Sequence, residues 1–199
     1  ISGSAAQYGR SVATDASGNV YTSGYFFGTC DFNPDKKLKY MMTAIGGSDS
    51  YYQKLDVNGN FVWAKQLGGT ESEYCYEICV NSAGLYATGY FYNTVDFNPG
   101  SGTFNLTSQG LQDMFILKLD LGGNFSWVKQ IGGSGYNCGC SIKTDASGNI
   151  YTTGYTYLTC DFNPDPVSTY FITAENYDNS FVCKTDPNGN FLWVTQAGG

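Results

Sequence analysis

Short runs of apolar and aromatic residues alternate with turn residues along the chain, and no long stretch has the spacing of an amphipathic helix. In the first part of the chain, such runs predict strands at about Arg10–Thr14, Val20–Phe27, Ser50–Leu55 and Phe61–Gln66. Asp, Asn and Gly follow the first and the third runs, as the tight turns of β-hairpins require. The pattern therefore predicts two hairpins, which together supply four antiparallel strands.

The same pattern occurs three times in the chain. Two phrases mark it, Gly-Asn-Phe-x-Trp and Asp-Phe-Asn-Pro, and the copies of each are about 65 residues apart. The copies lie at Gly59–Trp63, Gly123–Trp127 and Gly189–Trp193, and at Asp31–Pro34, Asp96–Pro99 and Asp161–Pro164. We therefore predict three tandem repeats, at residues 1–69, 70–133 and 134–199.

Four antiparallel strands per repeat, in tandem, are typical of the blades of a β-propeller. The predicted fold class is therefore all-β, with three tandem four-stranded antiparallel blades that belong to a longer array. Stacked blades bury the aromatic residues of one sheet against the next, so we interpret Trp63, Trp127 and Trp193 as packing residues rather than as a platform for sugars. The loop between the two hairpins has room for a short extra β-ribbon, since Phe104–Thr107 alternates between apolar and polar residues.

Three segments of the chain, at residues 18–26, 31–34 and 54–69, resemble the SBBP repeat, a bacterial β-propeller repeat. The resemblance implies a propeller, commonly of seven blades, in a secreted or cell-surface protein, and it implies no catalytic residues. Three blades do not close a ring of four to eight, and the chain begins at Ile1 and ends at a repeat boundary. We therefore expect either further blades outside this segment or an open array.

Charge and composition narrow the classes of partner. The net charge is -7, and the ten Lys and Arg residues are scattered. Nucleic acids and anionic membrane surfaces attract clustered basic residues, so neither is expected as a partner. No apolar run is long enough to span a bilayer. The partners that remain are proteins or glycans at a surface, and adjacent repeats of the same or another chain.

The residues present exclude several kinds of catalysis. The sequence has no histidine, which removes Ser-His-Asp and Cys-His mechanisms and every His-ligated metal site. A pair of carboxylates could still act on a glycosidic bond. Such a pair should not recur in every repeat, and the acids that meet this condition are Glu71, Glu73, Glu77 and Glu175. The alternative, which we favour, is that these acids form a solvated rim.

Oxygen-rich turns raise the question of calcium, which is the cofactor that the sequence leaves open. Alternating oxygen ligands occur in the loops of the first and third repeats, at Asp31, Asn33, Asp35, Asp161, Asn163 and Asp165. The favoured interpretation is structural: Asp and Asn accept bonds from loop N–H groups, while Phe32, Phe97 and Phe162 are buried as anchors.

The cysteines allow two interpretations. There are seven, at Cys30, Cys75, Cys79, Cys138, Cys140, Cys160 and Cys183. They are either small buried residues or partners in disulfides of an oxidising compartment, and the odd number leaves at least one unpaired within this segment. Cys138 and Cys140 are two residues apart on one strand face, which is poor geometry for a mutual bridge.

Together these observations predict a non-catalytic structural or binding module, such as an adhesin, a surface scaffold or an extracellular filament subunit. The alternative is part of a propeller enzyme that acts on polysaccharide, with its site completed by blades outside the segment. The residues that break the repeat discriminate between the two. A cluster of acids and aromatic residues at one blade edge favours the enzyme, whereas scatter favours the scaffold.

Overall fold

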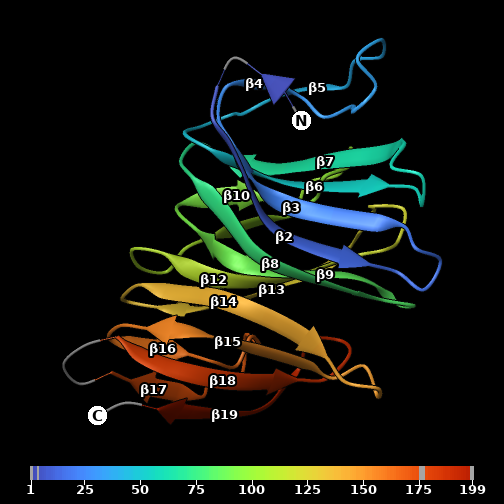
Figure 1. The fold of residues 1–199 in the computed structure, drawn as a ribbon. Helices are drawn as coiled ribbons and strands as arrows, with labels where there is room; N and C mark the ends of the chain where they lie inside the picture. Colours follow the sequence, from blue (N-terminus) through green and yellow to red (C-terminus); the bar gives the residue numbers. More distant parts are fainter. Residues whose placement is uncertain (1, 4, 175–177, 198–199) are drawn as a thin grey trace.

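The computed structural model describes residues 2–3, 5–174 and 178–197, and this part of the chain consists of β-strands, turns and loops without helices (Figure 1). The pairs of neighbouring strands are antiparallel. The predicted all-β antiparallel class is therefore confirmed for the described residues. The sheets follow one another as stacked layers, from the first repeat at the top of Figure 1 to the third at the bottom, without closing a ring.

Each repeat contributes four long strands, paired in the order in which they follow along the chain. In the first repeat they are β2 (Gln7–Thr14), β3 (Val20–Phe26), β6 (Asp49–Leu55) and β7 (Phe61–Gly69). In the second they are β8 (Glu73–Asn81), β9 (Gly84–Phe91), β12 (Asp113–Leu119) and β13 (Phe125–Gly133). In the third they are β14 (Asn137–Thr144), β15 (Ile150–Thr156), β18 (Asn179–Thr185) and β19 (Phe191–Ala197).

The long loop between the two hairpins contains the short ribbon that Phe104–Thr107 predicted. Two strands of three residues pair in each repeat. They are β4 (Thr29–Asp31) with β5 (Met41–Thr43), β10 (Thr94–Asp96) with β11 (Asn105–Thr107), and β16 (Thr159–Asp161) with β17 (Phe171–Thr173).

These ribbons join each repeat to the one before it. Strand β10 pairs with the end of β7, and β16 pairs with the end of β13 in the same way. Strand β4 pairs likewise with β1 (Ser2–Gly3). In the described part of the chain the sheets therefore have six, six, four and three strands, so the prediction of three tandem four-stranded blades is not confirmed as such.

The Gly-Gly pairs at the ends of β7 and β13 explain why the ribbon of the next repeat extends these sheets. A Cβ atom at Gly69 would lie 2.4 Å from the carbonyl oxygen of Thr94, and one at Gly133 would lie 2.1 Å from that of Thr159. Only glycine lets the next ribbon approach this closely. The phrase that marks the predicted repeat boundary is thus the point at which neighbouring repeats share hydrogen bonds.

The core lies between the sheets, because both faces of the central strands are buried. Along β12, successive side chains point to opposite faces. Phe115 and Leu117 belong to a cluster with Tyr52 of the first repeat, whereas Ile116 belongs to a cluster with Ile142 of the third. Each of these residues is at most 1% exposed.

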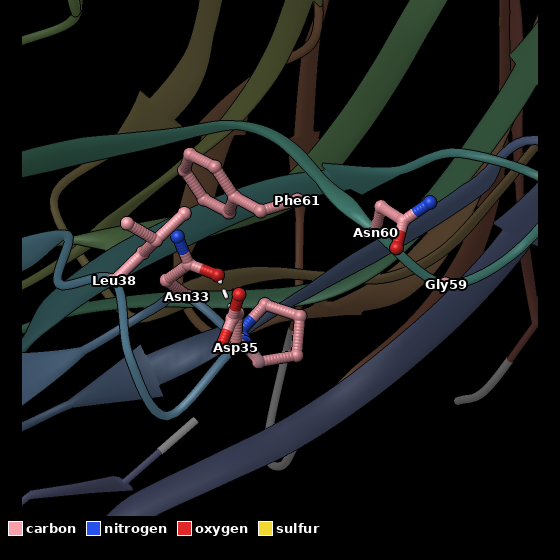
Figure 2. A pocket seen from close by; sticks show the side chains of 7 residues that line it. Asn33, Asp35, Leu38, Gly59, Asn60 and Phe61 are labelled. Atoms are coloured by element: carbon pink, nitrogen blue, oxygen red, sulfur yellow. Dashed lines mark hydrogen bonds between the residues drawn. The ribbon is translucent and has the colours of Figure 1, made fainter.

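Each Asp-Phe-Asn-Pro loop is anchored by its phenylalanine, as the sequence predicted. Phe32, Phe97 and Phe162 are at most 1% exposed. The ring centroid of Phe97 lies 5.1 Å from that of Phe91 and 5.2 Å from that of Phe115. In the first repeat, the rest of the loop lines a shallow groove in which Asn33, Leu38 and Phe61 lie side by side (Figure 2).

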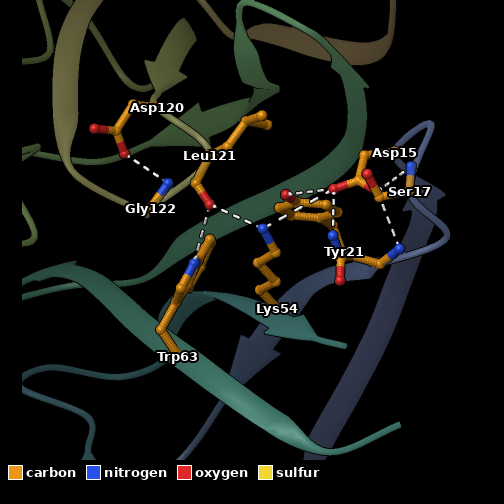
Figure 3. A network of polar contacts seen from close by, with 9 residues as sticks. Asp15, Ser17, Tyr21, Lys54, Trp63, Asp120, Leu121 and Gly122 are labelled. Carbon is orange, nitrogen blue, oxygen red and sulfur yellow. Dashed lines mark hydrogen bonds and ion pairs between the residues drawn. The ribbon is translucent and has the colours of Figure 1, made fainter. Parts of the chain in front are cut away.

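The outer strands of the first two repeats carry the tryptophans that hold the next repeat. The indole Nε1 of Trp63 donates to the carbonyl oxygen of Leu121, in the β12–β13 turn of the second repeat, at 3.3 Å (Figure 3). The ammonium of Lys54 donates to the same oxygen at 3.3 Å, and it lies 4.9 Å from the ring centroid of Tyr21. One carbonyl of the second repeat therefore accepts two bonds from the first.

The same turn presents a glycine to the indole ring. A Cβ atom at Gly123 would lie 3.0 Å from the ring of Trp63, and one at Gly189 would lie 3.0 Å from the ring of Trp127. Both glycines have a φ of 78°, which few other residues adopt. Trp193 has the equivalent position in the third repeat and is 41% exposed. The first two tryptophans are therefore packing residues between repeats, as predicted.

Candidate functional site

The first strand of each repeat contains a β-bulge at the same place. The register of pairing shifts between Gly9 and Ser11, between Cys75 and Glu77, and between Gly139 and Ser141. The residues left over at these bulges are Arg10, Tyr76 and Cys140. A bulge re-aims the side chain of the extra residue, and bulges are common next to functional sites.

The recurring Gly-Tyr phrase makes room for this bulge. A Cβ atom at Gly24, Gly89 or Gly154, opposite the bulge, would lie 1.8 Å from a carbonyl oxygen of the first strand. The glycine thus repeats, whereas the bulged residue differs in every copy. The bulge is thus one of the positions at which the three repeats differ.

The tyrosines around the first two bulges form a continuous group, which we call the tyrosine cluster. Its members are Tyr8, Tyr25, Tyr74, Tyr76, Tyr90 and Tyr92. Successive ring centroids are between 4.6 and 5.7 Å apart. The guanidinium of Arg10 lies 5.3 Å from the centroid of Tyr25 and 5.4 Å from that of Tyr76, so it joins the aromatic rings of two repeats.

A small pocket opens beside the tyrosine cluster. It is lined by Glu71, Ser72, Tyr74, Tyr90, Tyr92 and Asn93. Burial, together with the neighbouring tyrosines, raises the pKa of Tyr90, and burial raises the pKa of Tyr92. Both phenols are therefore neutral at physiological pH, so they offer a hydroxyl and an apolar ring face. Aromatic faces with a few polar groups are typical of a binding pocket.

The described acids that the sequence offered as catalytic candidates lie in three different surroundings. Glu71 is exposed at the pocket, whereas Glu73 is 1% exposed and accepts a hydrogen bond from the Gly69 N–H at 3.0 Å. Glu77 reaches the third repeat, where the N–H of Ile142 donates to it at 2.6 Å and the ammonium of Lys143 at 2.7 Å. Two of the candidates therefore lie at junctions between repeats, and Glu175 lies outside the described residues.

A buried aspartate at the start of β6, and its equivalent in β12, were not singled out from the sequence. The amide Nε2 of Gln66 donates to Asp49 at 2.5 Å, and that of Gln130 donates to Asp113 at the same distance. A Cβ atom at Gly68 would lie 2.0 Å from the carboxylate of Asp49. The recurrence of Gln two residues before Gly-Gly could have indicated this aspartate. The Gln amide donates to its carboxylate, and the first glycine leaves room for it.

Burial changes the protonation of the carboxylates at the first junction. It is the main cause that raises the pKa of Glu73 to about 8, and the charges of Asp49 and Glu71 add to it. Burial also raises the pKa of Asp49. The residues equivalent to Glu73 in the other repeats are uncharged, Gln7 and Asn137. Asp49, Glu71 and Glu73 therefore repel one another at the junction of the first two repeats.

The candidate calcium ligands make hydrogen bonds within their loops. The carboxylate of Asp31 accepts from the N–H of Asn33 at 3.1 Å and from that of Tyr40 at 3.0 Å. In the third repeat, Asp161 accepts from the N–H of Asn163 at 3.0 Å. The side-chain oxygens of Asn33, Asp35, Asn163 and Asp165 accept similar bonds. In the described ranges, no three His, Cys, Asp or Glu side chains are grouped as a metal site requires. Calcium binding, the alternative that the sequence left open, stays untested.

The seven cysteines are free thiols, and six of them are buried. This agrees with the interpretation as small buried residues for all but Cys140, which is exposed at the third bulge. Within the residues that the structure places, no helix is long and apolar enough to cross a membrane.

Part of the chain matches a known repeat family. Residues 126–157 match the family model of the beta-propeller repeat, SBBP. The predicted resemblance is confirmed. The matched SBBP segment starts in β13, the outer strand of one repeat, and continues through the bulged strand β14 and strand β15 of the next. It therefore spans the junction at which the repeats share hydrogen bonds.

A relative extends over nearly the whole chain. It is an uncharacterized WD repeat-containing protein of Acanthamoeba polyphaga mimivirus, 26% identical over 219 residues. The alignment covers 96% of this chain and 16% of that protein. This chain is thus similar to a small part of a much longer repeat protein.

The structural role of the Asp-Phe-Asn-Pro loops predicts how they respond to a chelator and to the loss of an anchor. EDTA should leave the melting temperature unchanged, because backbone N–H groups already occupy the loop oxygens. Phe97→Ala should lower the free energy of unfolding by about 3–5 kcal/mol, since the ring is buried. Phe104→Ala is the matched control, because Phe104 belongs to the same loop and is 42% exposed. A drop in melting temperature with EDTA that calcium restores would contradict the structural role.

The acidic junction predicts a pH dependence of stability. The pKa of Glu73 is raised from 4.5 to about 8, so the folded chain binds more protons than the unfolded chain between these values. Its contribution to stability is therefore present at low pH and is lost as the pH rises toward 8. Glu73→Gln removes this pH dependence, because the glutamine amide does not ionise. Gln is also the residue at the equivalent position in the first repeat.

The measurement is the free energy of unfolding of wild type and Glu73→Gln in urea at several pH values. The advantage of the variant over wild type should grow from pH 5 to pH 8. A difference that stays constant over this range would show that Glu73 is not the titrating group.

Proposed function

We propose that this chain is a non-catalytic scaffold and binding module of a secreted or cell-surface protein, of the adhesin type, and that its tyrosine cluster binds a glycan. The observation that supports it most is the division of labour among residues. Contacts between repeats are made by residues that recur, such as Trp63 and Gly69, whereas the residue at the bulge, beside the tyrosine cluster, differs in each repeat.

The scaffold role rests on the contacts between repeats. Trp63, the ribbon strand β10 and the buried Asp49 occupy the junction between the first two repeats. Their equivalents occupy the next junction. The SBBP match and the WD repeat relative both belong to repeat proteins. A framework of this kind holds a surface in fixed geometry, and the surface then decides what is bound.

The glycan role rests on the pocket beside the tyrosine cluster. Tyr74, Tyr90 and Tyr92 offer ring faces against which the C–H groups of a sugar pack, while Ser72 and Asn93 offer hydrogen-bond partners for its hydroxyls. The tyrosine cluster carries one cation, Arg10, and the pocket carries one acid, Glu71. This balance suits a neutral sugar better than a strongly charged one.

The enzymatic alternative is less well supported. A glycosidase needs two carboxylates that flank the scissile bond. Of the described candidates, Glu71 reaches the pocket, while Glu73 and Glu77 are held at the junctions. The cluster beside the pocket is aromatic, includes Tyr25 and Tyr90 of the recurring Gly-Tyr phrase, and lacks a second accessible acid among its described members. We therefore favour binding without cleavage.

Adjacent repeats are a second kind of partner. Trp193 is 41% exposed, whereas its equivalents Trp63 and Trp127 lie against a glycine of the next repeat. At the opposite face, a Cβ atom added at Gly59 would meet nothing within 4 Å, although the equivalent Gly123 and Gly189 are covered. The two faces are complementary, so a further repeat of the same or another chain fits either of them.

The glycan proposal is tested by calorimetric titration with a panel of neutral oligosaccharides, followed by two variants. Tyr92→Ala should weaken the binding of the best ligand at least about tenfold, which is about 1.4 kcal/mol. Tyr157→Ala is the matched control, because Tyr157 has the equivalent position in the third repeat and lies outside the pocket. Equal losses in both variants, or no binding of any panel member, would contradict the glycan proposal. Release of reducing ends by the wild type would contradict the non-catalytic one.

A further inference from the structure

Two thiols occupy the third bulge, at the positions where the other repeats carry Tyr8 and Arg10, and Tyr74 and Tyr76. The Sγ atoms of Cys138 and Cys140 are 3.8 Å apart. Cys138 is fully buried, whereas Cys140 is exposed to solvent. One thiol of the pair is therefore open to a reagent, and the other lies directly behind it.

The bulge brings these thiols together. In a regular strand, residues two apart are separated by about 6.4–6.8 Å along the strand, which is why the sequence predicted poor geometry for a bridge. Cys140 is the extra residue of the bulge, so the regular alternation ends at Gly139. The assumption of a regular strand is therefore wrong at this position.

The contact differentiates the two sulfurs chemically. The sulfurs of Cys138 and Cys140 are within hydrogen-bond distance, and this contact lowers the pKa of Cys140 to about 7 although burial opposes it. The same contact, together with burial, raises the pKa of Cys138. Thiolates rather than thiols attack disulfides. Cys140 is thus the thiol that attacks the substrate, and Cys138 is the thiol that attacks the resulting mixed disulfide.

The other five cysteines are buried. Burial raises the pKa of Cys75 and of Cys79 to about 11, and that of Cys183 to about 12. They lie among core side chains and are at most 9% exposed. The chemistry of an accessible dithiol is therefore confined to the third bulge.

We propose that Cys138 and Cys140 form a dithiol site that undergoes thiol–disulfide exchange with an accessible disulfide, either of a low-molecular-weight thiol or of an extended peptide. The Cys140 thiolate attacks one sulfur of the substrate, the substrate S–S bond breaks, and the first thiolate leaves with a proton from solvent. Cys138 then loses its proton and attacks Cys140 Sγ, which releases the second thiolate. The products are a Cys138–Cys140 disulfide and a substrate reduced by two electrons to two thiols.

The surroundings place this chemistry on the surface that carries the binding residues. Tyr155 and Tyr76 both lie close enough to Cys138 and Cys140 for the thiols to affect their pKa values. Tyr76 also belongs to the tyrosine cluster. A partner that rests on the tyrosine cluster would therefore have Cys140 beside it.

The test is the reaction of the reduced, folded chain with an aromatic disulfide, 5,5′-dithiobis(2-nitrobenzoate), whose released thiolate absorbs visible light. Wild type should release two thiolates per chain and keep no label, because Cys138 displaces the bound half. Cys138→Ala should release one thiolate and keep one label at Cys140. Cys140→Ala should release none on the same timescale, since the six remaining thiols are buried.

Intact-mass measurement and peptide mapping identify the products, and circular dichroism establishes that each variant is folded. Cys140→Ala changes an exposed side chain, so it keeps the test valid if Cys138→Ala fails to fold. A wild-type chain that keeps a label at Cys140, or that reacts as fast after Cys140→Ala, would overturn the proposal.

Discussion

The middle sheet of this protein is apolar on both faces, and this constraint determines how the neighbouring repeats pack on it. Along β12, Phe115 and Leu117 point to the first repeat, while Met114 and Ile116 point to the third. A sheet of this kind is stable only when both faces are covered. The contact between successive repeats is therefore the unit on which stability depends, more than any single repeat.

The recurring phrases are best understood as the means of making that contact. The Gly-Gly pair admits the ribbon of the next repeat, the preceding Gln binds the buried aspartate, and the tryptophan packs under a glycine of the next turn. These positions recur, whereas the bulged residues Arg10, Tyr76 and Cys140 differ from repeat to repeat, and the candidate binding and redox residues lie at or beside them.

Much of the fold could be predicted from the sequence, because the same pattern of strands and turns occurs in three copies. The hairpin turns, the buried Phe32, Phe97 and Phe162, and the role of Trp63 and Trp127 follow from local patterns. The six-stranded sheets could not be predicted, since the pairing of β10 with β7 joins segments of different repeats. The bulges were not predicted, because the sequence analysis assumed regular alternation along each strand, and one extra residue interrupts that alternation. The thiol contact of Cys138 and Cys140 was missed with them.

The most direct test of the central role of the junction compares two tryptophans that differ only in whether a repeat follows them. Trp63→Ala removes an indole that packs on Gly123, whereas Trp193→Ala removes one that is 41% exposed. The measurement is the free energy of unfolding of both variants in urea. Trp63→Ala should lower it by about 3 kcal/mol, and Trp193→Ala by less than about 1 kcal/mol. Equal losses in the two variants would contradict the account, because they would show that each tryptophan stabilises its own sheet.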